Sequence, residues 1–420
     1  MNALFGLALK SAWNRRLTLG LTLLSIALAV TLLLGVERTR VAARASFSQS
    51  VSGADLVLGA RTSPVQLMLY SVFRMGGATN NIGWDSYQAV IRHPAVAWSI
   101  PIALGDSHRG FPVIGTDAAY FEHFRHGRGR SLSFAQGRPF DGLFEAVLGA
   151  EVARRLGYRL DQAITLSHGS GELKQSEHGD KPFTVVGILA PTGTPVDHSV
   201  HVSLEAIEAI HLDWQGGAPM PGVQISPEQV RKFDLSPKTI TAALIGLKQR
   251  TAVFKVQRHI NSYPKEPLLA VLPGVALDEL WRVVAMVEQA LLGISVLVVA
   301  VGLAGLVAVI LASLNERRRE LAVLRSVGAG PRHILALLAL EGASITLAGL
   351  GLGLLLLNLA AWLAGPTLEA RLGLTLALQE VSPAELKLLG AVFLTGVLAS
   401  LLPAALAYRQ ALTDGLTPRL

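Results

Sequence analysis

The chain has 420 residues, of which 51% are hydrophobic, and its formal net charge is +7. So apolar a composition is unusual for a protein that folds in water. The positive charge does not require nucleic acid, because basic residues beside membrane spans meet anionic lipid. The chain has no cysteine, which excludes a disulfide framework, so any domain outside the membrane needs an ordinary hydrophobic core.

Four uncharged runs are long enough to cross a bilayer, whose core requires about 20 apolar helical residues. They cover residues 17–36, 289–315, 342–368 and 388–408. We therefore predict four transmembrane helices, the alternative for each being a helix buried in a soluble core. The first run could also be a signal peptide, but it exceeds the roughly 7–15 apolar residues of such a segment, which favours a retained anchor.

Arginine and lysine are concentrated beside the spans on one side of the predicted membrane, which places that side and both termini in the cytoplasm. Lys10, Arg15 and Arg16 precede the first run, and five arginines lie between the second and third runs. In chain order the predicted segments are an amphipathic cytoplasmic entry helix (1–16), transmembrane helix 1 (17–36), an extracytoplasmic domain (37–285), transmembrane helix 2 (286–314), a cytoplasmic coupling loop (315–333), transmembrane helix 3 (334–364), a short extracytoplasmic loop (365–387), transmembrane helix 4 (388–408) and a cytoplasmic tail (409–420).

The large segment between the first two spans mixes two kinds of pattern. Residues 54–59 and 183–189 read as strands, whereas residues 84–92 and 203–211 read as helices. This mixture predicts an α+β fold for the extracytoplasmic domain. Residues 278–288 have helical spacing and run without a breaker into the second span, so we expect a helix that continues outside the membrane and could carry motion across it.

Histidines form the most suggestive group of potential ligands in this outer segment. His168, His178, His198 and His201 fall within 34 residues, close to several carboxylates. Imidazoles together with a carboxylate suit zinc or copper. In an extended segment, however, residues three apart point to opposite faces, so ordinary surface histidines are the favoured alternative. The sequence contains neither a phosphate-binding P-loop nor a His-Glu-x-x-His zinc motif.

Glycines recur in the second and third spans, at Gly302 and Gly305 and again at Gly349, Gly351 and Gly353. Small residues let helices approach closely in lipid. We expect these two spans to pack on each other or on a second copy, the alternative being that glycine is simply common in membrane helices.

The segment from 315 to 333 is short, rich in arginine and patterned as a helix. Its charges lie on one face and Leu321 and Leu324 on another, as in an amphipathic interfacial helix. A positive-inside anchor would explain the arginines alone. It would not explain Glu320, the leucine pair, or the turn that begins at Gly328.

The pattern Arg318-x-Glu320-Leu-x-x-Leu324-Arg325-x-x-Gly328-Ala329 resembles the cytoplasmic loop of FtsX/MacB/LolC-type ABC transporter permeases, the mechanotransmission or type VII group. The layout of one span, a large outer domain and three further spans agrees with this family. Three other motifs are similar to family motifs: Leu7-Ala-Leu-Lys-Ser-x-Trp-x-Arg15 in the entry helix, Gly53-Ala-Asp-Leu at the start of the outer domain, and Pro403-x-x-x-Ala407-Tyr-Arg409 in the tail.

The resemblance implies a permease subunit that is not itself an enzyme, located in the bacterial inner membrane. Such permeases form dimers and bind a dimeric cytoplasmic ATPase, which holds the ATP and magnesium, and ATP-driven motion of their periplasmic core domain exports or extracts an envelope substrate. A periplasmic adaptor or lipoprotein is a further expected partner, besides membrane lipid. By this resemblance the ATPase-coupling residues are Glu316, Arg317, Arg318, Arg319, Glu320, Leu324, Arg325, Gly328 and Arg332. Three alternatives stay open: a lipoprotein-releasing permease, a regulator of a periplasmic cell-wall hydrolase, and a metal-handling envelope protein.

Overall fold

The computed structural model describes residues 16–50, 53–127, 129–169, 178–215, 218–220, 222–223, 225–316, 330–372 and 381–413. The chain divides into two compact units. One comprises Met1–Ala42, Ala285–Glu369 and Leu376–Leu420, and the other comprises Ala43–Val284 with Ala370–Thr375. We call them the helical unit and the outer unit.

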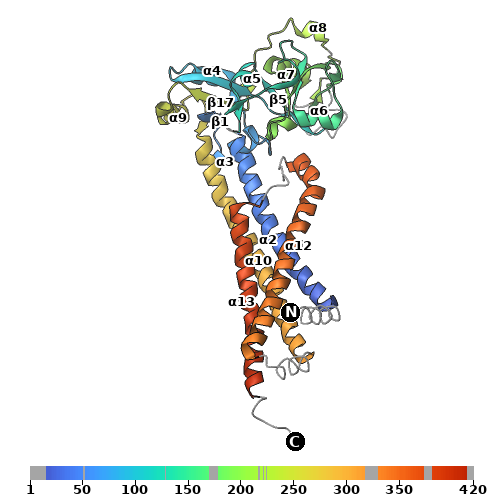
Figure 1. Ribbon diagram of the computed structural model, residues 1–420. Coiled ribbons are helices and arrows are strands. Elements are labelled where there is room, and N and C mark those ends of the chain that lie inside the picture. Colours follow the sequence, from blue (N-terminus) through green and yellow to red (C-terminus); the bar gives the residue numbers. More distant parts are fainter. Residues whose placement is uncertain are drawn as a thin grey trace. The chain divides into compact units, whose positions relative to one another are not determined.

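Four long helices carry the membrane-length apolar segments and confirm the predicted one-plus-three arrangement (Figure 1). They are α2 (Arg16–Gln49), α10 (Pro273–Glu316), α12 (Pro331–Leu372) and α13 (Pro383–Thr413). α10 begins before the residues where the sequence predicts a helical extension, and it continues unbroken through the second apolar run. The boundary between the two units falls inside α2 and inside α10, so both helices belong partly to each unit.

The helical unit has two apolar contact regions. In one, Ile26 and Val30 of α2 pack with Leu350 and Leu357 of α12 and with Leu389 of α13. In the other, α10 and α12 pack on each other through the side chains of Leu306, Ile310, Ile334 and Leu338.

Gly349, Gly351 and Gly353 of the third span do not lie in the contact between α10 and α12. A Cβ atom on Gly349 would lie 2.6 Å from Ile26, and one on Gly353 would lie 2.8 Å from Val30, so both glycines accommodate α2. Gly302 of α10 also faces α2, whereas Gly305 and Gly351 have no such neighbour within 4 Å. The predicted packing of spans two and three on each other is confirmed, but it uses leucine and isoleucine side chains, whereas Gly302, Gly349 and Gly353 lie against the first span. Packing on a second copy stays a prediction.

The outer unit contains a four-stranded antiparallel sheet in the order β18-β1-β17-β3. Its strands are β1 (Leu56–Ala60), β3 (Val96–Ile102), β17 (Ala242–Leu247) and β18 (Leu268–Val271). Successive residues of β1 point to opposite faces of the sheet, and each face packs against a separate apolar core. Leu56 and Leu58 pack with side chains of α4 (Trp84–Ile91) and α9 (Val253–Asn261), whereas Val57 packs on the side of α3 (Pro64–Ser71).

A larger mixed sheet runs in the order β10-β12-β9-β13-β5-β4-β11, with β8 also paired to β12. β9 is parallel to β12 and β5 is parallel to β13, while the other pairs are antiparallel. Its strands are β4 (Asp106–His108), β5 (Phe111–Thr116), β8 (Phe134–Gly137), β9 (Glu145–Leu148), β10 (Ala163–Ile164), β11 (Ser167–His168), β12 (Phe183–Leu189) and β13 (Val200–Ser203).

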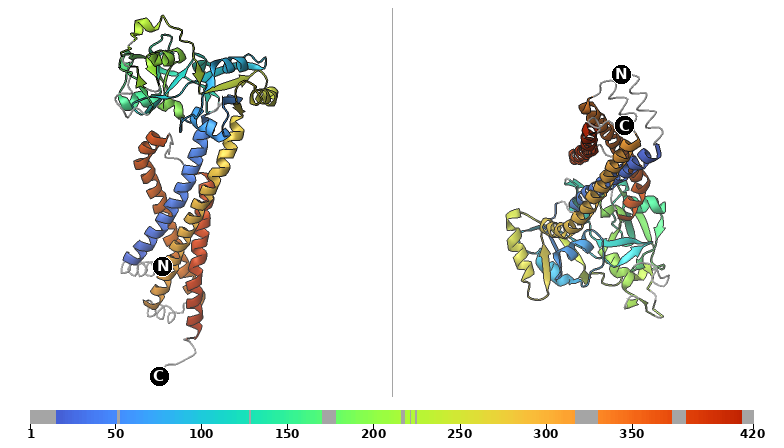
Figure 2. Two further views of the ribbon diagram at one scale, coloured as in Figure 1. Left: turned by 180° about the vertical axis from the view of Figure 1, so that it is seen from behind. Right: turned by 90° about the horizontal axis from the view of Figure 1, so that it is seen from below.

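Helices α6 (Ala150–Leu156) and α7 (Leu204–His211) contribute to the apolar core of this larger sheet. Figure 2 shows the ribbon from behind and from below. The outer unit is thus an α+β domain, which confirms the fold class. Its remaining elements are β2 (Ile82–Gly83), α5 (Ala119–His123), β6 (Arg125–His126), β7 (Arg130–Ser131), η2 (Pro195–His198), β14 (Trp214–Gln215), β15 (Ala218–Pro219), α8 (Pro227–Val230), β16 (Thr239–Ile240) and η3 (Arg250–Ala252).

Candidate functional site

A carboxylate and an imidazole meet at the edge of the larger sheet. β11 pairs with β4 in an antiparallel register that places His168 opposite Asp106. Their side chains lie on the same face, with His168 Nδ1 3.2 Å from Asp106 Oδ1. The Asp106 side chain is only 4% exposed, whereas that of His168 is 41% exposed. In this pair the carboxylate of Asp106 is buried and the imidazole of His168 is open to solvent.

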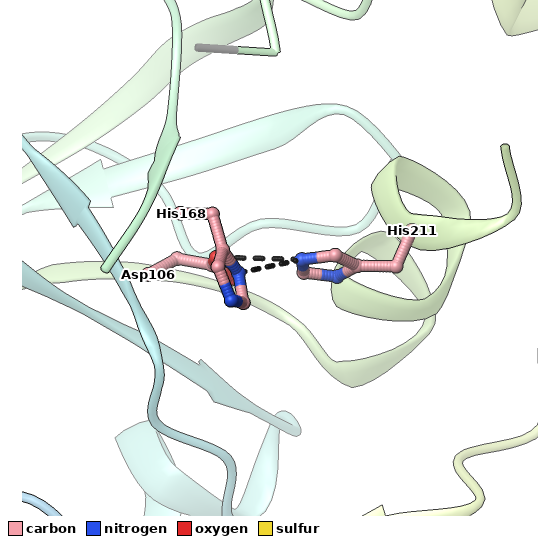
Figure 3. A group of neighbouring side chains, drawn as sticks. All are labelled: Asp106, His168 and His211. Carbon is pink, nitrogen blue, oxygen red and sulfur yellow. Dashed lines mark hydrogen bonds and ion pairs between the residues drawn. The ribbon is translucent and has the colours of Figure 1, made fainter. Parts of the chain in front are cut away.

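A second imidazole reaches this pair from the last residue of α7. Ser203 caps the start of α7 by accepting a hydrogen bond from the Ala206 amide, and His211 ends the helix. His211 Nδ1 donates to the carbonyl of Ile207, at 2.7 Å, because a carbonyl can only accept. Nε2 of His211 is thereby directed at the pair, 3.2 Å from His168 Nδ1 and 3.5 Å from Asp106 Oδ1 (Figure 3).

The charge of this group is set by its hydrogen bonds. Burial acts to raise the pKa of Asp106, but hydrogen bonds from His168 and His211 outweigh it and lower the pKa to about 2. Burial acts to lower the pKa of His211, but its hydrogen bond to Asp106 and the charge of that carboxylate leave the pKa raised. At neutral pH the group therefore contains a carboxylate anion with imidazole nitrogens directed toward it.

A third histidine lies against the group and is fully buried. The ring of His178 lies 5.0 Å from that of His211 and 4.1 Å from that of Trp214, between ring centroids. Among the residues that the structure describes, neither of its ring nitrogens has a hydrogen-bond partner. Burial and the neighbouring His211 lower the pKa of His178 to about 4, so its ring is neutral at neutral pH.

A buried ion pair fixes the segment that carries His178. The ammonium of Lys181 lies 2.8 Å from both carboxylate oxygens of Asp213, two residues after the end of α7, and 2.9 Å from Asp180. The backbone amide of His178 donates to the carbonyl of Leu166, close to β11. Both ends of the segment are thus connected to elements that carry the other side chains of the site.

The structure brings together only part of the histidine group that the sequence suggests. His168 and His178 lie at the site. His198 stacks on Phe111, and His201 is buried in β13 with its ring nitrogens 3.3 Å from Tyr120 Oη and the Val147 carbonyl. Sequence reasoning missed Asp106 and His211, which lie 62 and 43 positions from His168. Two features of the sequence could have indicated them. Asp106 lies in the polar segment 105–110, and His211 ends the amphipathic helix predicted for residues 203–211.

Most of the predicted coupling segment lies outside the described residues. Glu316 is the last residue of α10, and Arg332 is exposed in the first turn of α12. The predicted coupling residues outside the described part are Arg317, Arg318, Arg319, Glu320, Leu324, Arg325 and Gly328.

Two family models together match most of the chain. The MacB-like periplasmic core domain matches residues 19–244, and the FtsX-like permease C-terminal domain matches residues 292–416. The chain belongs to the FtsX/MacB-type ABC transporter permeases. The described residues of this permease contain four membrane-length apolar helices, as expected of a multi-pass membrane protein.

The solved structures that the chain matches include two domains from outside the membrane. One is the extracellular domain of the noncanonic ABC-type transporter YknZ from Gram-positive bacteria, with 10% identity and a TM-score of 0.31, covering 51% of the permease and 98% of that chain. The other is the periplasmic region of MacB from Actinobacillus actinomycetemcomitans, with 9% identity and a TM-score of 0.31. The match covers 54% of the permease and 91% of that chain. No curated protein matches the permease.

Proposed function

We propose that the permease transmits ATP-driven motion from a separate cytoplasmic ATPase to its outer unit, and so exports or extracts an envelope substrate. The observation that carries this proposal is the presence of a MacB-like core domain and an FtsX-like permease domain in one chain. α2 and α10 support it, because each is a single unbroken helix that contributes to both units. A continuous helix gives motion a covalent route from one unit to the other.

The motor in this proposal is a second protein, which binds ATP and magnesium. The 420 residues contain no P-loop motif, whose backbone amides and lysine would hold the phosphates of ATP. The ATPase docks at residues 315–333, where five consecutive charged residues (316–320) precede Leu321 and Leu324. Such a surface offers both ion pairs and apolar contacts to a partner.

The proposal includes an orientation and a second copy. Arginines beside the spans place both termini and residues 315–333 in the cytoplasm of a cell whose inner membrane holds the permease. Ile294, Leu297 and Val301 of α10, which are spaced three and four residues apart within the apolar run, are exposed. In the membrane this face of α10 is covered by lipid and by the second permease of a homodimer.

Co-purification and ATPase assays test the coupling role. We expect the permease to co-purify with an ATPase encoded beside it and to stimulate its turnover. Glu320→Lys and Arg325→Glu should leave membrane insertion intact and abolish the stimulation, since each reverses a charge at the docking surface. Arg231→Glu, at an exposed position of the outer unit, is the matched control and should stimulate normally. Full stimulation by both coupling variants would contradict the proposal.

The two alternatives that share this machinery differ only in what the outer unit moves. A lipoprotein-releasing permease would co-purify with lipoprotein, and a regulator of wall hydrolysis would co-purify with a hydrolase. Mass spectrometry of cross-linked partners from the cell envelope separates these cases from export.

A further inference from the structure

We propose that the outer unit holds a zinc ion on Asp106 Oδ1, His168 Nδ1 and His211 Nε2, with His178 as the fourth ligand. The inference stands apart from the coupling role, because it rests on side chains of the outer unit alone. These three residues each offer one ligand atom, and the three atoms lie within 4.8 Å of one another.

The spacing of the three atoms matches one face of a zinc coordination tetrahedron. With zinc–nitrogen and zinc–oxygen bonds of about 2.1 Å, the ligand atoms of a tetrahedral site are about 3.4 Å apart. The observed separations are 3.2 Å, 3.2 Å and 3.5 Å. An ion can therefore contact all three atoms with little movement of the backbone.

Hydrogen bonds alone satisfy this group less well than an ion would. His168 Nδ1 and His211 Nε2 both donate toward Asp106 Oδ1 and lie only 3.2 Å apart, so two donors face each other beside a single acceptor oxygen. With a metal ion in the centre, all three atoms donate lone pairs to one acceptor. The Nδ1–H of His211 remains bonded to the Ile207 carbonyl, which is the outer contact that usually orients a metal-bound imidazole.

His178 supplies an independent observation at the same place. A buried imidazole without a hydrogen-bond partner is costly, because burial removes its water and nothing replaces it. Both ring nitrogens of His178 lack a partner among the described residues, and its ring lies against that of His211. His178 is not one of the three residues whose ligand atoms cluster within 4.8 Å. It would become a ligand when its ring turns toward the ion, while its backbone amide stays bonded to Leu166.

The chemistry of the ligands selects the class of metal. Three imidazoles and one carboxylate suit zinc and its first-row neighbours, whereas calcium and magnesium prefer oxygen ligands. The charge of Lys181 does not oppose a cation, because its ammonium is paired with Asp213 and Asp180. The side chain of His168 is 41% exposed, so an ion can reach the site from solvent.

Zinc titration of the untagged full-length permease in detergent, after chelator treatment, tests the site. We expect calorimetry with zinc alone to give one ion per chain with micromolar or tighter affinity. His168→Ala and His211→Ala should each weaken binding by more than about 100-fold, since ligand loss exceeds the 10–100-fold effect of outer-shell changes. Asp106→Asn and His178→Ala should also weaken it. His198→Ala, which removes a histidine outside the site, should bind zinc like the unchanged protein.

Cobalt gives a second readout that does not depend on affinity. Cobalt(II) bound to the unchanged permease should give the intense visible absorption of tetrahedral coordination, and His211→Ala should lose it. Matching melting curves of metal-free variants and metal-free unchanged protein would establish that the variants fold. The proposal is overturned if the unchanged protein takes up no zinc, or if His168→Ala and His211→Ala bind it as tightly. Unchanged affinity in His178→Ala would overturn the assignment of the fourth ligand.

Discussion

The guanidinium of Arg38 in α2 lies 2.6 Å from the carboxylate of Glu385 in α13, although 347 positions separate them in the chain. A second nitrogen of Arg38 donates to Asn358 of α12, at 2.8 Å. The two charged side chains are only 8% and 4% exposed. Glu385 also accepts a hydrogen bond from the backbone amide of Ser382 at the start of α13. One polar cluster therefore joins three of the four long helices.

Removing one partner of this ion pair should destabilise the helical unit strongly. Arg38→Leu leaves a buried carboxylate without its counter-charge, which typically costs about 3–5 kcal/mol. The double variant Arg38→Leu with Glu385→Leu should lose less, because no charge is stranded. Unfolding by denaturing detergent measures both. Arg138→Leu breaks a more exposed pair with Glu145 in the outer unit and should cost far less, because exposed ion pairs contribute little to stability. A double variant no more stable than Arg38→Leu would count against this account.

Gly353 should be intolerant of a larger side chain. A Cβ atom there meets Val30 at 2.8 Å and the Ala27 carbonyl oxygen at 2.9 Å, so Gly353→Val should force α12 away from α2. Overpacking of this kind costs about 1–3 kcal/mol. Gly351→Val, two residues earlier with nothing within 4 Å, is the matched control. Equal melting temperatures for the two variants in detergent would show that the close approach is unimportant for stability.

The buried His201 should make the outer unit less stable in acid. Burial, together with the positive charge of Arg74, lowers the pKa of His201 to about 3, against about 6.5 in an unfolded chain. Below pH 6.5 the unfolded chain takes up a proton that the folded chain refuses, so stability falls by up to roughly 1.4 kcal/mol per pH unit.

Thermal unfolding between pH 7 and pH 4 measures this dependence on pH. His201→Gln can still bond to Tyr120 and the Val147 carbonyl, and it should flatten the curve relative to the unchanged protein. Parallel curves for the two proteins would mean that His201 is not responsible for the acid sensitivity.

Lys181 should be essential to the stability of the outer unit. Its side chain is fully buried and its ammonium is held by Asp213 and Asp180, so Lys181→Ala leaves a buried carboxylate unpaired. We expect a loss of about 3–5 kcal/mol. Lys232→Ala, at an exposed position, should change stability by less than about 0.5 kcal/mol. Denaturant titration of the two variants provides the comparison, and similar midpoints would refute the role of the buried pair.

The long helices were predictable because each follows from an uncharged run whose length alone matches a bilayer. Elements of the outer unit such as β12 and α7 were predictable for a similar local reason, namely their apolar periodicity. The contacts of the glycines were not predictable from the sequence. It shows that Gly353 is small, but it does not show that Val30 lies opposite it.

The candidate metal centre was predictable only in part, because two of its residues are distant in the chain from the other two. His168 and His178 stand out as neighbours in the chain. Asp106 joins them through the register of β4 and β11, and His211 joins through the packing of α7. Strand register and helix packing depend on the whole fold of the outer unit. Local patterns in the sequence do not determine either of them.

The length of α10 has a mechanical consequence. At 1.5 Å per residue, its 44 residues extend for about 66 Å, more than twice the roughly 30 Å hydrocarbon thickness of a bilayer. Tilting a rod of this length by about 10° around one end displaces the other end by about 11 Å. A tilt of about 10° at one end thus becomes, at the other end, a displacement as large as a helix diameter.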